Sequence, residues 1–110
     1  MTQDDRAAAI AALNDACRAA PGQGWMVTSG VRALGEDFLR AALVAVAAFK
    51  AFDTGDDPWG EHDFGALFIQ GRRLFWTIDC YDLTLTGGSP DPADPAVTRR
   101  VLTLMVSEEY

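Results

Sequence analysis

The chain has 110 residues, nearly half of them hydrophobic, with nine Lys and Arg against sixteen Asp and Glu and a formal net charge of −7. This length and composition fit one domain that can bury a modest core. Nucleic-acid backbones are bound through Lys and Arg, so the negative charge argues against direct nucleic-acid binding. The longest apolar stretch, residues 41–49, is far shorter than the ~20 residues of a membrane span, and no membrane attachment is expected.

The first predicted element is a helix over residues 4–20. Ile10, Leu13 and Cys17 follow the i, i+3, i+7 spacing of one apolar stripe in an alanine-rich background. Residues 21–24, with the sequence Pro-Gly-Gln-Gly, end this helix.

A short strand is predicted over residues 25–28, and residues 31–34 are expected to continue it in another direction. The main core helix is predicted from Glu36 to Phe52, because apolar residues recur there at helical spacing and the first turn is acidic. A turn-rich loop comes next.

Residues 64–70 and 73–81 are predicted to form a hairpin around Gly71. One face of the second strand is apolar and is expected to lie against helices. That face carries Leu74, Trp76, Ile78 and Cys80.

The last segment has two open interpretations. Asp94 and Pro95 are typical of an N-cap and a first helical residue, so we predict a closing helix. Its apolar face is Val97, Val101, Leu104 and Met105. The β-branched content of the same segment leaves a strand as the alternative.

The order helix, strand, helix, hairpin, helix predicts an α+β fold, in which a small antiparallel sheet with a central hairpin packs against two to three helices. We expect a single domain over residues 1–110, with an N-terminal helix and linker over residues 1–24. The two cysteines, Cys17 and Cys80, lack CxxC spacing and are interpreted as buried thiols of a cytoplasmic protein. The opening residues also lack the pattern of a signal peptide.

The negative charge is concentrated between Asp53 and Pro95, where nine acids outnumber two bases and account for the whole net charge. The acids are Asp53, Asp56, Asp57, Glu61, Asp63, Asp79, Asp82, Asp91 and Asp94. An acidic surface of this kind suits a divalent cation or a basic protein surface.

The only histidine, His62, lies between Glu61 and Asp63 in this stretch. An imidazole beside carboxylates can carry general acid–base catalysis or ligate a transition metal. Glu61, His62 and Asp79 are therefore the candidate catalytic residues, and Asp57, His62 and Asp79 are the candidate metal ligands. The structural alternative is that His62 and its neighbours hydrogen-bond the loop backbone and fix the entry into the hairpin.

Asp79, on the second hairpin strand, is interpreted either as a functional carboxylate or as the partner of an arginine, Arg99 or Arg100. Asp91 is interpreted as a turn residue of a Pro-rich loop. Trp59, a large apolar residue in an acidic loop, is a candidate binding anchor.

Four blocks of the sequence resemble a known family. They are residues 57–65 (DPWGEHDFG), 75–82 (FWTIDCYD), 89–92 (SPDP), and 98–103 (TRRVLT) with the final pair 109–110. From about Trp25 to Tyr110 the chain resembles a small bacterial, mostly alphaproteobacterial family, domain of unknown function 3768. The family usually has Lys and Tyr where this chain has Thr77 and Cys80. The resemblance implies a setting near plasmid or other mobile-element genes, and it implies no reaction.

Two functions stay open at this point. The first is a non-enzymatic interaction or inhibitor protein, possessing no cofactor, that docks an acidic face on a basic protein such as a nucleic-acid-binding protein. Its binding residues are Asp56, Asp57, Trp59, Glu61, Asp63 and Asp91. The second is a small acid–base or divalent-metal enzyme centred on His62 with Asp57 or Glu61 and Asp79. The first function requires the loops at residues 53–63 and 87–94 to form one surface.

Overall fold

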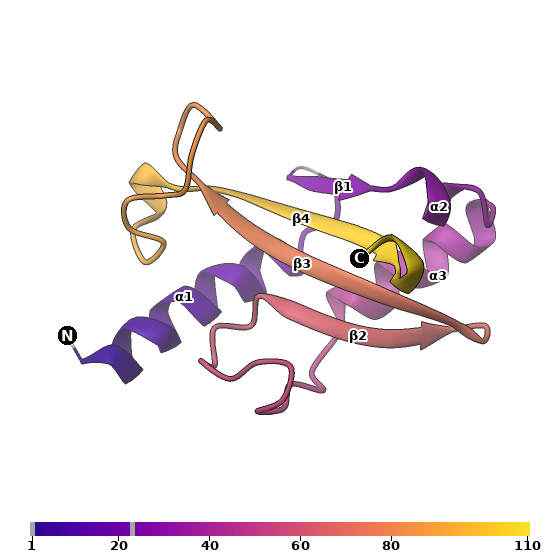
Figure 1. Cartoon of the computed structure of the whole chain (residues 1–110), viewed down its shortest axis with the longest axis horizontal. Helices are drawn as coiled ribbons and strands as arrows, with labels where there is room; N and C mark the ends of the chain where they lie inside the picture. The colour runs from indigo at the N-terminus through magenta and orange to yellow at the C-terminus, as the bar shows by residue number, and fades with distance from the viewer. Residues whose placement is uncertain (1, 23) are drawn as a thin grey trace.

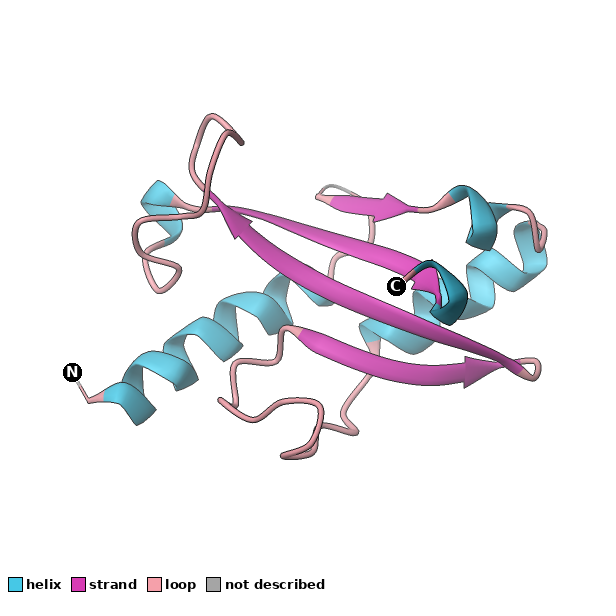
Figure 2. Cartoon of the chain, viewed as in Figure 1, coloured by secondary structure: helices cyan, strands magenta, loops and turns pink. Residues whose placement is uncertain are grey.

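The computed structural model describes residues 2–22 and 24–110. Two long helices, α1 (Gln3–Arg18) and α3 (Glu36–Ala47), cover one face of a four-stranded sheet (Figure 1). The strands are β1 (Trp25–Val27), β2 (Phe64–Ile69), β3 (Arg72–Tyr81) and β4 (Arg99–Val106). The short helices α2 (Ser29–Arg32), η1 (Pro95–Val97) and η2 (Ser107–Glu109) lie between or after them (Figure 2). The fold class is α+β, as predicted.

The helix α1 begins with a capping box. The Thr2 hydroxyl accepts a hydrogen bond from the backbone N–H of Asp5, and the Asp5 carboxylate accepts one from the backbone of Thr2. The buried side of the helix is not the predicted apolar stripe, because Leu13 and Cys17 are only half-buried. Of the predicted stripe only Ile10 is buried, and the other buried positions are Ala11, Asn14 and Arg18, so two polar side chains enter the interior.

The helix α3 ends at Ala47, short of the predicted end at Phe52. Phe49 and Phe52 leave the helix and pack edge-on against Trp76, with ring centroids 5.5 and 6.1 Å from the indole. The buried Arg18 guanidinium donates to three backbone carbonyls at this helix end, which satisfies groups that the helix leaves unpaired. A longer helix would remove both the aromatic cluster and this cap.

Residues 29–32 form the helix α2 and do not continue the strand, which corrects the expectation for residues 31–34. The Thr28 hydroxyl caps this helix by accepting a hydrogen bond from Val31 N–H at 3.4 Å. Val31 is fully buried in the core. The turn therefore places one apolar side chain inward immediately after β1.

The predicted hairpin is confirmed as β2 and β3, which pair from Phe64↔Thr77 to Ile69↔Arg72. Leu74 and Trp76 are fully buried on the helix-covered face, and Ile78 is nearly so. Gly65 lies opposite Trp76, and a Cβ on it would come 2.3 Å from the indole nitrogen. Glycine at this position lets the sheet backbone lie directly under the largest side chain of the core.

The predicted closing helix is wrong, because Arg99–Val106 form the strand β4. The start signal at Asp94 is used, but only for the single turn of η1, where the Asp94 carboxylate accepts from Ala96 N–H. Beyond that turn the side chains alternate: Leu102, Leu104 and Val106 are buried and face the helices. The β-branched residues in this segment suit a strand that is paired on both sides.

The sheet is mixed rather than purely antiparallel, which corrects the second part of the fold prediction. Its order is β1-β4-β3-β2, and β1 pairs with β4 in parallel from Trp25↔Leu102 to Val27↔Leu104. β3 and β4 are antiparallel. Because the last segment was predicted to be a helix, the sequence did not lead us to expect the long connection from β1 to its parallel neighbour β4.

The core lies between the sheet and the two long helices. Its buried members are Val31, Phe38, Ala42, Val46, Leu74, Trp76, Ile78, Leu102, Leu104 and Val106. At one end of the opposite sheet face, Tyr110 packs against Phe64 and Phe75, with ring centroids 5.8 and 5.1 Å away. Across residues 2–22 and 24–110, no helix is both long and apolar enough to traverse a bilayer.

Candidate functional site

Asp57 organises the acidic loop that precedes β2. Its side chain is buried, and its carboxylate accepts hydrogen bonds from the backbone N–H groups of Glu61 at 3.0 Å and His62 at 3.2 Å. The backbone N–H of Asp57 in turn donates to the Asp53 carbonyl at 2.8 Å. Asp57 therefore fixes the conformation of the loop through the backbone hydrogen bonds that its carboxylate accepts, as in an Asx turn.

His62 is held in a left-handed backbone conformation, with φ of 56°. Its ring stacks on Phe52, with centroids 3.8 Å apart and an interplanar angle of 4°. Nδ1 lies 2.8 Å from Asp15 Oδ1, and Nε2 lies 3.9 Å from Asp57 Oδ2. The imidazole therefore sits between two carboxylates, one from the loop and one from α1, and stays partly exposed.

Arg18 continues this network into the core. Its guanidinium donates to Asp15 Oδ1 at 2.9 Å and lies 5.3 and 5.4 Å from the ring centroids of Phe52 and Trp76. The same group caps the end of α3 through three carbonyls. A cavity of about 380 Å³ opens beside it, lined by Asp15, Arg18, Ala19, Ala47, Ala48, Phe49, Lys50, Phe52 and His62.

The arrangement around His62 pairs an imidazole with the carboxylate of Asp15. A histidine hydrogen-bonded to a carboxylate can accept or donate a proton at its other nitrogen. In the part of the chain that the structure describes, no group of three or more His, Cys, Asp or Glu side chains could hold a metal ion. Asp79, proposed as a ligand with Asp57 and His62, is exposed on β3, one position past the buried Ile78.

Asn14, fully buried on α1, joins the two acidic loops. Its amide nitrogen donates to the Glu61 carbonyl at 2.9 Å, and its amide oxygen accepts from the Arg100 guanidinium at 2.7 Å. Arg100 also donates to the Pro92 carbonyl. Because Asn14 contacts the first loop and its partner Arg100 contacts the second, α1 runs between them.

A second bridge lies nearer the start of α1, where Arg6 forms an ion pair with Asp91 at 2.5 Å. Arg6 also lines a hollow of about 290 Å³ with Thr2, Gln3, Ala7, Trp59 and Glu61. The two loops thus lie on either side of the first turns of α1 (Figure 1). We call this region the acidic end; it comprises Asp4, Asp5, Asp53, Asp56, Trp59, Glu61, Asp63, Asp91 and Asp94.

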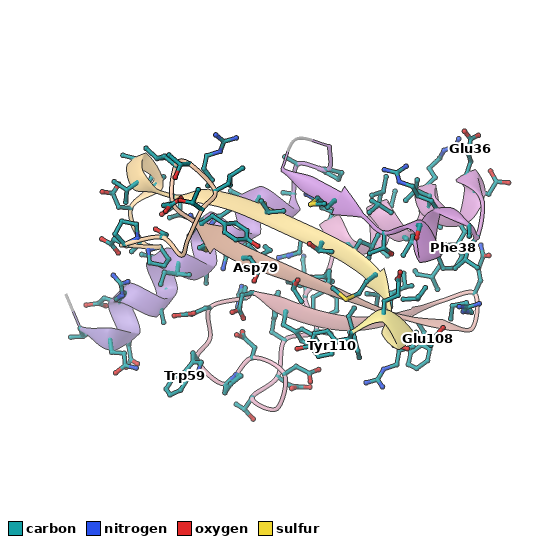
Figure 3. The ribbon with its side chains drawn as sticks, turned by 45° about the horizontal axis from the view of Figure 1, so that its top comes forward. Glu36, Phe38, Trp59, Asp79, Glu108 and Tyr110 are labelled. Carbon is teal, nitrogen blue, oxygen red and sulfur yellow. The ribbon has the colours of Figure 1, made fainter. Side chains whose placement is uncertain are left out.

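Trp59 is the large apolar side chain of the acidic end. It is 68% exposed, which is unusual for an indole. Figure 3 shows it projecting from the loop away from the sheet, well apart from Asp79. Because the indole lies at the rim of the hollow beside Glu61, it offers contact area without any rearrangement of the loop.

The carboxyl groups of the region differ in their pKa shifts. Partial burial raises the pKa of Glu61 and of Asp63, and the charge of Asp63 raises that of Glu61 further. The hydrogen bond from Arg6 lowers the pKa of Asp91, and the backbone N–H of Thr86 lowers that of Asp82. Glu61 and Asp63 therefore gain most when a cation or a proton approaches.

The arginine partners predicted for Asp79 are engaged elsewhere or lie across the strand. Arg100 pairs with Cys80 in the register and reaches Asn14 and Pro92 on the helix side. Within the described ranges, 2–22 and 24–110, no ion pair includes Asp79. Asp79 is an exposed carboxylate on the sheet face opposite the helices, close enough to Asp63 for its charge to raise the pKa of that carboxyl group.

The two cysteines are free and only partly buried. Desolvation raises the pKa of both thiols, and the nearby Arg100 lowers both to a lesser extent. Each thiol is therefore less easily ionised than an unperturbed cysteine.

Three residues of α1 were missed by the sequence analysis: Asn14, Asp15 and Arg18. The signal was present, since Asn14 and Arg18 have the i, i+4 spacing of the buried positions that begin at Ile10. A polar pair on the inner face of a helix indicates partners in the interior.

Comparison with known proteins gives one match. The model of a family described as "Protein of unknown function (DUF3768)" matches residues 27–109, more than half of the chain. Neither a curated protein nor a solved structure matches.

Proposed function

The chain belongs to the DUF3768 family, whose function is unknown, and we propose that it is a non-enzymatic interaction protein that docks its acidic end on a basic protein surface. In this role it is an accessory or inhibitor protein of the anti-defence type, acting in the bacterial cytoplasm on a nucleic-acid-binding protein. Such a partner has a basic groove that an acidic surface can occupy.

The observation that carries the proposal is the exposed Trp59 in the acidic end. The indole lines the same hollow as the Glu61 side chain of its own loop and Arg6 of α1. An aromatic anchor surrounded by charge is the usual composition of an interface hot spot with a polar rim. Charges steer the encounter, and the indole supplies buried area once the complex has formed.

The loop and the α1 residues that support it have different roles in this proposal. Asp56, Trp59 and Glu61 are the contact residues of the loop, together with Asp63 and, across α1, Asp91. Asp57 is buried and accepts backbone hydrogen bonds, so it positions the loop rather than touching a partner. A loss of binding in an Asp57 variant would therefore not separate docking from misfolding.

The proposal is tested by capturing partners from bacterial lysate through a photo-crosslinking amino acid at Asp56, followed by affinity measurements with the purified partner. We expect a basic protein whose affinity falls steeply between about 50 and 200 mM salt, because exposed charge pairs are screened. Trp59→Ala should weaken binding at least tenfold, as loss of a hot-spot residue costs about 2 kcal/mol. Asp56→Lys should slow association more than it speeds dissociation.

The matched control is Asp37→Lys, which reverses another exposed acid, on α3, and leaves the acidic end unchanged. Its affinity should equal that of the wild-type chain. Binding that is insensitive to salt, to Asp56→Lys and to Trp59→Ala would rule out docking through this end.

A second function, acid–base or metal-assisted catalysis, is favoured by the contact between His62 Nδ1 and Asp15 Oδ1 at the edge of the 380 Å³ cavity. Its first test is the thermal stability of metal-stripped protein with Mg²⁺, Mn²⁺, Ca²⁺, Zn²⁺ or Ni²⁺. A bound ion at a hundred times its Kd adds about 2.7 kcal/mol, or roughly 10 °C in a chain of this size. A selective increase that disappears in His62→Ala would favour this function over the first.

A further inference from the structure

The strand β2 lies at the edge of the sheet, with β3 on one side and, across residues 2–22 and 24–110, no strand on the other (Figure 1). The Asp63 carbonyl accepts a hydrogen bond from Ile78 N–H, so odd-numbered residues of this segment direct their backbone groups to β3. Phe64, Ala66 and Phe68 consequently direct their N–H and C=O groups to the free edge. Among the residues that the structure describes, no backbone group outside the sheet bonds to them.

This edge lacks the features that protect edge strands from pairing with another chain. From Phe64 to Ile69 it contains no charged residue and no proline, and its register with β3 has no bulge. Phe68 is 70% exposed on it. A strand of six residues with three outward-facing backbone pairs is long enough to add to another sheet.

The charges at the two ends of β2 are opposite. Glu61 and Asp63 come directly before the strand, and Arg72 and Arg73 come directly after the turn that ends it. Antiparallel pairing of two identical strands places the start of each beside the end of the other. In a twofold pair the acids of one copy therefore lie at the same end as the arginines of its partner, whereas a parallel pair would place like charges together. Within one copy Arg72 pairs with Glu108 at 3.1 Å and Arg73 lies over the Phe75 ring, so both arginines keep these contacts at the start of β3.

We propose that β2 is a dimerisation edge, and that a second copy of this chain pairs with it antiparallel to form one continuous eight-stranded sheet. The register with Leu67 on the twofold axis places Phe68 of one copy opposite the small side chain of Ala66 in the other.

The test is the oligomeric state of the whole chain, measured by sedimentation velocity between about 1 and 500 µM. We expect reversible dimerisation, with Phe68→Lys raising the dimer dissociation constant at least tenfold because it places a charge on the edge. Hydrogen exchange gives a residue-level readout. The amides of Phe64, Ala66 and Phe68 should be protected at high concentration and exchange freely at low concentration, whereas those of Gly65 and Leu67 should be protected at both.

Charge exchange tests the direction of pairing. Arg72→Glu/Arg73→Glu and Glu61→Lys/Asp63→Lys, each checked for folding by circular dichroism, should dimerise less than the wild-type chain, and their mixture should form a heterodimer. A monomer at 500 µM would overturn the proposal. So would a dimer in which Phe68→Lys and the arginine double variant leave the dissociation constant and the exchange pattern unchanged.

Discussion

At the scale of single residues, the network around His62 is built from groups that satisfy one another. Asp15 accepts from both His62 and Arg18, and Arg18 caps the end of α3 from inside the core. Removing one member leaves a buried donor or acceptor without a partner, which costs about 1–3 kcal/mol for each such group. This network explains why the chain tolerates a left-handed backbone at His62.

Asp63 provides a test by pH at the same scale. Partial burial raises the pKa of its carboxyl group in the folded state, so unfolded chains release the proton first as the pH increases. Asp63 therefore lowers the free energy of unfolding at neutral pH, and the penalty disappears as the pH falls from the raised folded value through the ordinary value of about 3.9. Asp63→Asn should raise Tm at pH 7, and this gain should shrink towards pH 4.

Thermal unfolding followed by circular dichroism at several pH values measures the effect. Asp56→Asn is the matched control, because it makes the same change from carboxylate to amide in the same loop. A Tm gain for Asp63→Asn that is equal at pH 4 and pH 7 would contradict the assignment to its ionised form.

At the scale of elements, β4 holds the sheet together because it pairs with two strands at once. Leu102 N–H donates to the Gly24 carbonyl, and Thr28 N–H donates to the Leu104 carbonyl. The even-numbered residues of β4 therefore form their backbone hydrogen bonds on the side of β1. The odd-numbered residues of β4, including Thr103 opposite Thr77, form their backbone hydrogen bonds with β3. An edge strand such as β2 carries only half of these bonds.

This difference predicts unequal costs for proline. Thr103→Pro removes a bond in the middle of the sheet and should lower the free energy of unfolding by about 3 kcal/mol or more. Ala66→Pro removes an N–H that points to the free edge, where proline is tolerated, and should cost much less. Urea unfolding of the two variants measures both values, and equal losses would contradict the assigned order of the strands.

At the scale of the whole molecule, α1 is part of the domain although it precedes the family match at residues 27–109. Asn14 and Arg18 supply the contacts that close the acidic loop and the end of α3. A further part of the core face is covered by Ile10 and Ala11. These contacts join α1 to the part of the chain that the family model matches.

A chain that begins at Trp25 should accordingly lose cooperative unfolding. Exposing the face that α1 covers, together with several unpaired buried groups, removes a large part of a total stability that is about 5–15 kcal/mol in ordinary domains. Dispersion of amide signals in NMR spectra and a thermal transition in circular dichroism measure this. A dispersed spectrum and a sharp transition for residues 25–110 would show that α1 is dispensable.

Elements that depend on short-range sequence patterns could be predicted from the sequence. The hairpin, the core position of Trp76 and the α+β class result from alternation, from Gly71 and from helical spacing. The start signal at Asp94 was also correct, but it governs one turn of η1 only. Residues 99–106 become a strand because β1 and β3 flank them on both sides, and no pattern within those residues reveals these neighbours.

The sequence by itself determined that the negative charge belongs to two loops and that His62 and Trp59 lie in one of them. Only the tertiary structure decided that α1 joins those loops, that Asp15 rather than Asp79 meets His62, and that Asp57 faces inward. The physical reason is that charge and periodicity are properties of the chain, whereas partners of buried polar groups are chosen when distant elements pack.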